Sequence, residues 1–156
     1  MAFGIVWLAC KEGHAVAVPL DRGKPSVIPT GLGSHTFAVT DDALWVTNCE
    51  VGTISRIDPR IQEVTTIQEV GSGIGITAGG GYVWSSGSKG IAKIDPQTGR
   101  VVDHLSVAPG VYFKLVWDDG VIWASTRGSE VLKLHATSRG DGQAGDVRLL
   151  DRLRLP

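Results

Sequence analysis

The stretch GGGYVWSSGSKGIAKIDPQTGR, residues 79 to 100, combines a glycine triplet, a tryptophan, a short alternating run and an Asp-Pro turn. A glycine-rich run of this kind is compatible with either a tight turn or a phosphate-binding loop. A phosphate loop opens a helix and usually carries Lys-Ser or Lys-Thr, and this stretch has neither feature. The triplet therefore predicts a hairpin turn between two strands.

The tryptophan of this stretch belongs to a series. Trp7, Trp45, Trp84 and Trp123 are spaced by 38, 39 and 39 residues, and an aliphatic residue precedes each of them. Short runs with a period of two residues surround each tryptophan, up to four runs in a unit of about 39 residues. This pattern is typical of β-propeller blades, each of which is a four-stranded antiparallel sheet. The sequence therefore predicts an all-β fold with four blades.

The repeats divide a single β-propeller domain into four blade units, at approximately residues 3–31, 33–70, 72–108 and 111–155. The first unit starts directly on its tryptophan strand, so we expect this blade to lack its innermost strand and the chain to form a partial or half propeller. Three arrangements remain open: a fragment of a longer propeller, a homodimer that completes an eight-bladed ring, and a small four-bladed ring. We expect the segment at residues 135–146 to be a long loop in the last blade.

Residues that recur in equivalent positions are explained by structure. The four tryptophans are large enough to fill the space between stacked blades. Asp58 and Asp95 stand in repeated Ile-Asp-Pro sequences, where an aspartate side chain accepts hydrogen bonds from the turn that follows. A catalytic group is needed once per site, whereas a turn is needed in every blade, so repetition favours structural roles.

The segments AGGGYVWSSGSKGIAKIDPQTGRVV and DDALWVTNCEVGTISRIDP resemble the repeats of the streptogramin B (virginiamycin B) lyase-like and YVTN-type β-propeller superfamily. The resemblance implies a propeller fold. For its lyase members it also implies a metal-dependent C–O lyase that opens a cyclic depsipeptide lactone by elimination. The same repeat occurs in many binding and sensor proteins, so the resemblance is more specific for the fold than for the activity.

Ligands of propellers usually bind at the mouth of the central channel, near the start of the innermost strands. Alignment on the tryptophans places His35, Ile74 and Phe113 at equivalent positions there. His35 is the candidate for a general base, and the alternative is a histidine that bonds only neighbouring backbone. The predicted ligand-binding residues at this mouth are Ser34, His35, Thr36, Tyr112, Phe113 and Lys114.

The metal chemistry of a lyase has little support in the sequence. The loop carboxylates nearest to the expected mouth are Glu50 and Glu130, and no Glu-x-His pair stands at equivalent loop positions. We therefore expect no cofactor, with Mg²⁺ required only if the chain is lyase-like. The two cysteines, Cys10 and Cys49, follow equivalent strands, and we do not expect them to form a disulfide.

The composition of the chain argues against two classes of partner, nucleic acids and membranes. The chain has 15 Lys and Arg against 16 Asp and Glu, so it lacks the basic surplus typical of nucleic-acid binding. No stretch approaches the roughly 20 apolar residues of a membrane span, and no signal segment is seen at the N-terminus, so a cytoplasmic location is the default expectation. These features favour a non-catalytic binding module for a protein or small ligand. The alternative is the lyase, or an inactive fragment of one.

Overall fold

The computed structural model describes residues 2–68, 70–88, 90–105, 107, 112–126, 130–136 and 147–154. Every regular element among these residues is a β-strand, and no part of them forms a helix with the length and apolar character needed to cross a membrane. The strands form four antiparallel sheets in which each strand pairs with the next one along the chain. The predicted all-β class is confirmed. The loop expected at residues 135–146 lies largely outside the described residues.

The first sheet has three strands and each of the others has four, as the repeat predicts. The first contains β1 (Ile5–Cys10), β2 (His14–Pro19) and β3 (Ser26–Pro29). The second contains β4 (Ser34–Val39), β5 (Leu44–Asn48), β6 (Thr53–Ile57) and β7 (Val64–Ile67). The third contains β8 (Ile76–Gly79), β9 (Tyr82–Gly87), β10 (Gly90–Ile94) and β11 (Val101–Leu105). The fourth contains β12 (Tyr112–Asp118), β13 (Val121–Thr126), β14 (Glu130–Ala136) and β15 (Val147–Arg154).

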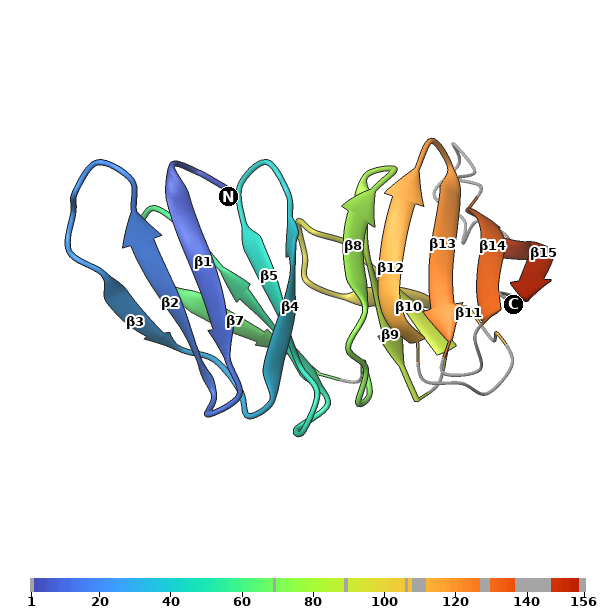
Figure 1. The fold of residues 1–156 in the computed structure, drawn as a ribbon, viewed down its shortest axis with the longest axis horizontal. Coiled ribbons are helices and arrows are strands. Elements are labelled where there is room, and N and C mark those ends of the chain that lie inside the picture. The colour runs from blue at the N-terminus through green and yellow to red at the C-terminus, as the bar shows by residue number, and fades with distance from the viewer. Residues whose placement is uncertain are drawn as a thin grey trace.

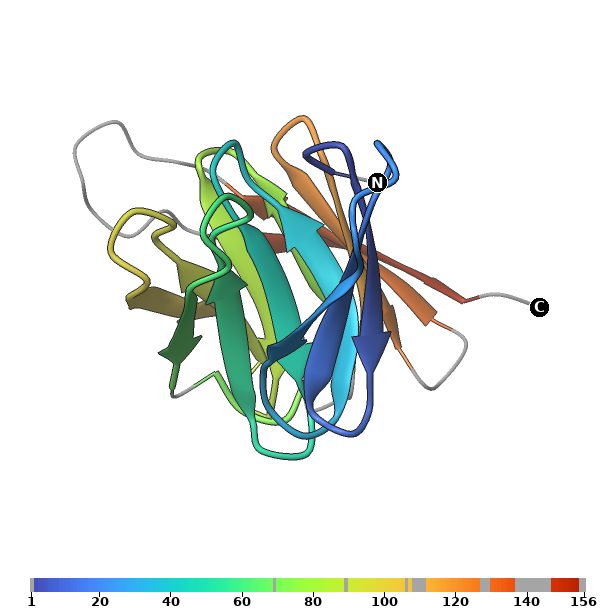
Figure 2. The same ribbon diagram turned by 90° about the vertical axis from the view of Figure 1, so that its left-hand side faces the viewer.

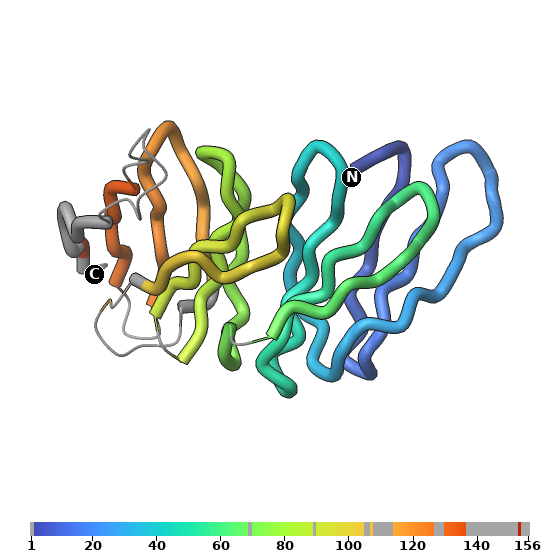
Figure 3. The backbone as a smooth tube through the Cα atoms, turned by 180° about the vertical axis from the view of Figure 1, so that it is seen from behind, coloured from blue at the N-terminus to red at the C-terminus, as the bar shows by residue number. Residues whose placement is uncertain are grey.

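The sheets follow one another along the long axis of the molecule, with the first sheet at one end and the fourth at the other (Figure 1). The opening strands of the last three sheets lie next to one another, since β4 contacts β8 and β8 contacts β12. The hairpins β6–β7 and β10–β11 lie on the opposite side, which faces the viewer in Figure 3. One side of the stack is therefore built from inner strands and the other from outer hairpins.

Each sheet packs on the next through its tryptophan. Successive side chains of a strand point to opposite faces, so a tryptophan faces the following sheet while the residues on either side of it face the preceding one. Trp7, Trp45 and Trp84 are 9%, 0% and 2% exposed, a burial that stabilises each interface by several kcal/mol. The three apolar clusters pair Trp7 with Leu44, Val46 and Ile57, Trp45 with Val83, Ala92 and Ile94, and Trp84 with Ile122, Leu132 and Leu134.

Two polar contacts recur around these tryptophans. The indole N–H donates to an acceptor five residues earlier in the chain, which satisfies the one polar group that the ring buries. In three sheets a basic side chain of the neighbouring strand lies over the ring. The indole acceptors are the Ala2 carbonyl at 3.3 Å for Trp7, Thr40 Oγ1 at 3.1 Å for Trp45 and the Gly79 carbonyl at 3.1 Å for Trp84. The cations are Arg56 at 5.8 Å from the Trp45 ring, Lys93 at 5.5 Å from Trp84 and Lys133 at 5.2 Å from Trp123.

Lys93 is the most deeply buried of these cations, with 3% of its surface exposed. Its Nζ atom lies 3.8 Å from the centre of the Tyr82 ring as well as over Trp84. Burial lowers the pKa of Lys93, and the carboxylate of Asp103 on β11 opposes that shift. The ammonium group is thus held by aromatic faces and one carboxylate in the interior between the third and fourth sheets.

The glycine triplet forms the hairpin turn between β8 and β9 that the sequence predicts. Gly80 and Gly81 have φ values of 61° and 81°, the left-handed pair that a two-residue hairpin turn requires. Gly79 is needed for a different reason. A methyl group on its Cα would overlap the ring of Trp117, which lies flat against this backbone. The opening stretch is therefore a turn and a packing surface.

We expect Gly79→Ala to lower the free energy of unfolding by about 3 kcal/mol, because the added methyl group displaces the Trp117 ring. Gly81→Ala is the matched control, since its methyl group meets no atom within 4 Å and adds only the backbone strain of a positive φ, about 1 kcal/mol. Urea denaturation of the two variants gives the comparison. Equal losses would contradict the packing role of Gly79.

The Asp-Pro turn of the third sheet makes stability depend on pH. The backbone N–H of Gln97 donates to the Asp95 carboxylate at 2.8 Å, and this bond, with further bonds from Thr98, lowers the pKa of Asp95 against the opposing effect of burial. A carboxyl with a lower pKa in the folded state stabilises that state above its unfolded pKa. The contribution is lost as pH falls through the folded pKa.

We therefore expect the destabilisation caused by Asp95→Asn to be larger near about pH 6 than near about pH 3, where the unfolded wild-type chain already binds the proton and the advantage of the lowered folded-state pKa diminishes. Thermal unfolding of both proteins across this range measures the difference. A loss of stability that is the same at both pH values would show that the charge of Asp95 is not what the turn bonds recognise.

Candidate functional site

The inner strands β4, β8 and β12 line a groove with a volume of about 560 Å³. Hydrogen bonds between neighbouring sheets fix the position of its walls. The hydroxyl groups of Thr36 and Thr47 both donate to the Ile74 carbonyl, the second at 3.2 Å, and thereby join the second sheet to the third. The backbone N–H of Trp117 donates to Thr77 Oγ1 at 3.2 Å and joins the fourth sheet to the third.

The groove combines an apolar wall with positive charge. Trp117 and Val116 contribute apolar surface from β12, and the Trp117 ring is stacked on Trp84 with the ring centres 5.9 Å apart. Among the described lining residues the ionisable ones are His35 and Lys114, which are both exposed, and none is a carboxylate. Such a surface is suited to a ligand that carries an anionic group on an apolar body.

Only some of the six side chains predicted for the channel mouth are found in the lining of the groove. His35, Thr36 and Lys114 line the groove. Ser34 does not line it, because its side chain is buried and bonded to neighbouring structure, 2.6 Å from Thr30 Oγ1 and 3.0 Å from Asn48 Oδ1. Tyr112 and Phe113 belong to β12, but their side chains lie outside the described part of the chain.

Among the lining residues that were not singled out from the sequence are Thr77 and Trp117, which are joined by a hydrogen bond across the junction between β8 and β12. Thr77 follows the start of β8, and Trp117 lies near the end of β12. Trp117 is the fifth tryptophan and falls outside the series spaced by 39 residues. That irregular position in the alternating run of β12 is the signal that would have directed attention to it.

The carboxylates proposed as metal ligands are not part of the groove. Glu50 lies in the turn after β5, and Glu130 begins β14. Within the described ranges no three His, Cys, Asp or Glu side chains are grouped so that they could hold a metal ion. This donor set does not fit the Mg²⁺ ion that the lyase resemblance implies. Cys10 and Cys49 are both free.

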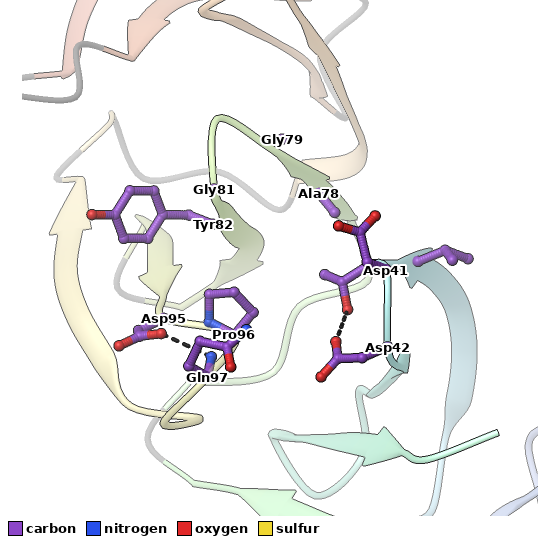
Figure 4. Close-up of a pocket in the computed structure, with 11 residues that line it drawn as sticks. Asp41, Asp42, Ala78, Gly79, Gly81, Tyr82, Asp95, Pro96 and Gln97 are labelled. Carbon is purple, nitrogen blue, oxygen red and sulfur yellow. Dashed lines mark hydrogen bonds between the residues drawn. The ribbon is translucent and has the colours of Figure 1, made fainter. Parts of the chain in front are cut away.

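A second cavity, of about 510 Å³, lies between the turns of the second and third sheets (Figure 4). It is lined by Asp41, Asp42, Asp95 and the Tyr82 ring, among others. Two of its carboxylates already have partners, since Asp42 accepts a hydrogen bond from Arg56 at 2.7 Å and Asp95 accepts one from its own turn. Because Asp42 and Asp95 are already engaged in this way, the groove of β4, β8 and β12 is the stronger candidate for a site.

No protein-family model and no curated protein matches the chain. Similar folds are found among solved structures. The computationally designed protein Ika4 has a TM-score of 0.77 and 12% identity, over 88% of each chain. The β-propeller domain of Cps50 (Swd1) from Myceliophteria thermophila has a TM-score of 0.78 and 13% identity, over 96% of this chain and 55% of that one.

Virginiamycin B lyase from Staphylococcus aureus has a TM-score of 0.74 and 17% identity, over 97% of this chain and 52% of the lyase. The chain thus spans about half the length of the Cps50 domain and of the lyase. Identities at this level show the fold alone. The chain folds as a partial β-propeller with four blades, the first of which has three strands.

Proposed function

We propose that this chain is a non-catalytic propeller module that binds a ligand in the groove of β4, β8 and β12. The observation that carries the proposal is the chemistry of the groove, in which the two ionisable residues of the described lining are basic and stand beside an apolar wall. The ligand class that fits is a compact molecule, or the end of a peptide, with a carboxylate or similar anion joined to an apolar group.

Different residues of the groove would contact different parts of the ligand. Lys114 supplies a fixed positive charge at the start of β12, and His35 and Thr36 supply hydrogen-bonding groups at the start of β4. Val116 and Trp117 offer apolar contact further along the same groove. A hydrogen bond between an ammonium and an anion contributes about 1.5–3 kcal/mol, so Lys114 is expected to account for much of the preference for anions.

The proposal assigns no elimination reaction to the groove. Opening a lactone by elimination requires a base near the α-proton and a cation that polarises the ester carbonyl. His35 is placed to meet a ligand, but the described lining residues supply no carboxylate that would bind a divalent cation beside it. The chemistry of this lining therefore favours binding over catalysis.

We expect naphthalene-2-carboxylate to bind in the groove more tightly than its neutral analogue, naphthalene-2-carboxamide. In Lys114→Gln the affinity for the carboxylate should fall about tenfold while that for the amide stays the same, because only the carboxylate uses the ammonium group. NMR titration, which reports both affinity and the residues affected, makes the measurement.

Lys24→Gln is the matched control, because Lys24 is exposed in the turn between β2 and β3, away from the groove. An equal loss of affinity in this variant, or an equal loss for both ligands in Lys114→Gln, would mean that non-specific charge accounts for the binding.

A titration with Mg²⁺ separates the binding module from the lyase. We expect the melting temperature to stay constant up to about 5 mM Mg²⁺, since an ion that bound the folded state at this concentration would raise it. A rise that is abolished by Glu50→Gln or Glu130→Gln, but not by Glu12→Gln, would contradict the proposal and support a metal site.

A further inference from the structure

The tryptophan of the fourth sheet lacks the cover that the other three possess. Trp7, Trp45 and Trp84 are at most 9% exposed, because the following sheet lies on each of them. Trp123 occupies the same position on β13, with Lys133 over its ring as Lys93 lies over Trp84, yet it is only half-buried. The same surface is thus built a fourth time, and none of the described sheets lies against it.

Three apolar side chains accompany Trp123 on this face of the fourth sheet, together with Lys114, Ser125 and Lys133. Val116 stands directly opposite Trp123 on β12, and Leu153 stands opposite Val131 at the other side of the sheet. Val116 and Leu153 are each 47% exposed. We call these four residues, Val116, Trp123, Val131 and Leu153, the Trp123 face.

The first sheet carries the complementary surface. Val6 and Leu8 flank Trp7 just as Leu44 and Val46 flank Trp45. Leu44 and Val46 are fully buried, because they cover the tryptophan of the preceding sheet, whereas Val6 and Leu8 are 37% and 50% exposed. Strand register places three more valines on this side, and we call the set of Val6, Leu8, Val16, Val18 and Val27 the Val6 face.

The two faces of one chain lie at opposite ends of the molecule (Figure 1). In the view from the end at which the first sheet lies, the strands of that sheet are in front (Figure 2). The faces of a single chain therefore do not cover each other. The chain nevertheless carries the two surfaces that a further interface would need, the Val6 face at one end and the Trp123 face at the other.

We propose that the Trp123 face of one copy packs on the Val6 face of a second copy, and that the reverse contact closes a ring of two chains. The interface within the chain that follows each tryptophan supplies the template for this contact. The inference rests on this packing rule and not on the proposed ligand, although Val116 belongs to both surfaces.

A closed pair also accounts for both faces at once. A head-to-tail contact that does not close generates fibres, whereas closure satisfies each apolar surface in a defined assembly. Two contacts formed together add their buried areas, and a stable interface needs about 1,200 Å² or more in total. At both ends of the stack the outer face exposes large apolar side chains, among them Leu8 at one end and Val116 at the other.

Sedimentation velocity of the 156-residue chain tests the proposal. We expect a dimer at micromolar concentration, and a dimer dissociation constant raised more than a hundredfold by Leu8→Asp or by Val116→Asp, since each places a charge in the apolar contact. Both side chains are exposed in one copy, so the variants should keep the unfolding midpoint of an isolated chain. Ile61→Asp, at a residue that is 68% exposed in the turn after β6, is the matched control and should remain dimeric.

Mixing the two variants distinguishes the proposed contact from other dimers. Leu8→Asp retains an intact Trp123 face and Val116→Asp retains an intact Val6 face, so an equimolar mixture should recover a dimer with one contact. If two Val6 faces paired symmetrically instead, Leu8→Asp alone would prevent dimerisation. The equimolar mixture would then contain no dimer of one variant with the other. The proposal would be overturned by the absence of this mixed dimer, by a wild-type chain that is monomeric at about 100 μM, or by growth of the chain into polymers.

Discussion

The insertion of one tryptophan from each sheet against the next is the interaction on which the rest of this structure depends. Because side chains alternate along a strand, the residues that flank a tryptophan cover the tryptophan of the preceding sheet. Leu44 and Val46 cover Trp7 in this way, while Trp45 between them faces the third sheet. Each sheet thus has two different faces that fit each other, and a repeat of about 39 residues is sufficient to extend the stack.

This packing also creates the groove. Sheets that stack on their broad faces leave their edges free, and on one side those edges are β4, β8 and β12. Side chains at such edges are not packed between two sheets, so they need not be apolar. Lys114 is exposed for this reason, although Leu115 next to it is buried against the third sheet. Stability and ligand recognition therefore use different residues of the same strands.

The spacing of the tryptophans was enough to predict the strands, the four sheets and the three-stranded first sheet. The site was less accessible from the sequence, because alignment identifies equivalent positions but not the direction of each side chain. The pairing of β4 with β5 shifts between Ser34 and Phe37, and that of β12 with β13 shifts between Tyr112 and Lys114. Such irregularities re-aim side chains. Ser34 therefore turns into a buried network while His35 beside it faces solvent.

Strand β12 takes part both in the proposed ligand groove and in the proposed contact between two copies. Within the chain, β1 lies beside β4 and so borders the groove on the side of the second sheet. In a ring of two copies, the first sheet of the second copy would follow the fourth sheet of the first, on the side of β12 where Lys114 is exposed. A ligand held there would contact both copies. Its binding would then favour the closed ring, because a ligand that binds one state more tightly shifts the equilibrium toward that state by its differential affinity. The single chain presents an open groove, and closure of the ring is what would enclose it.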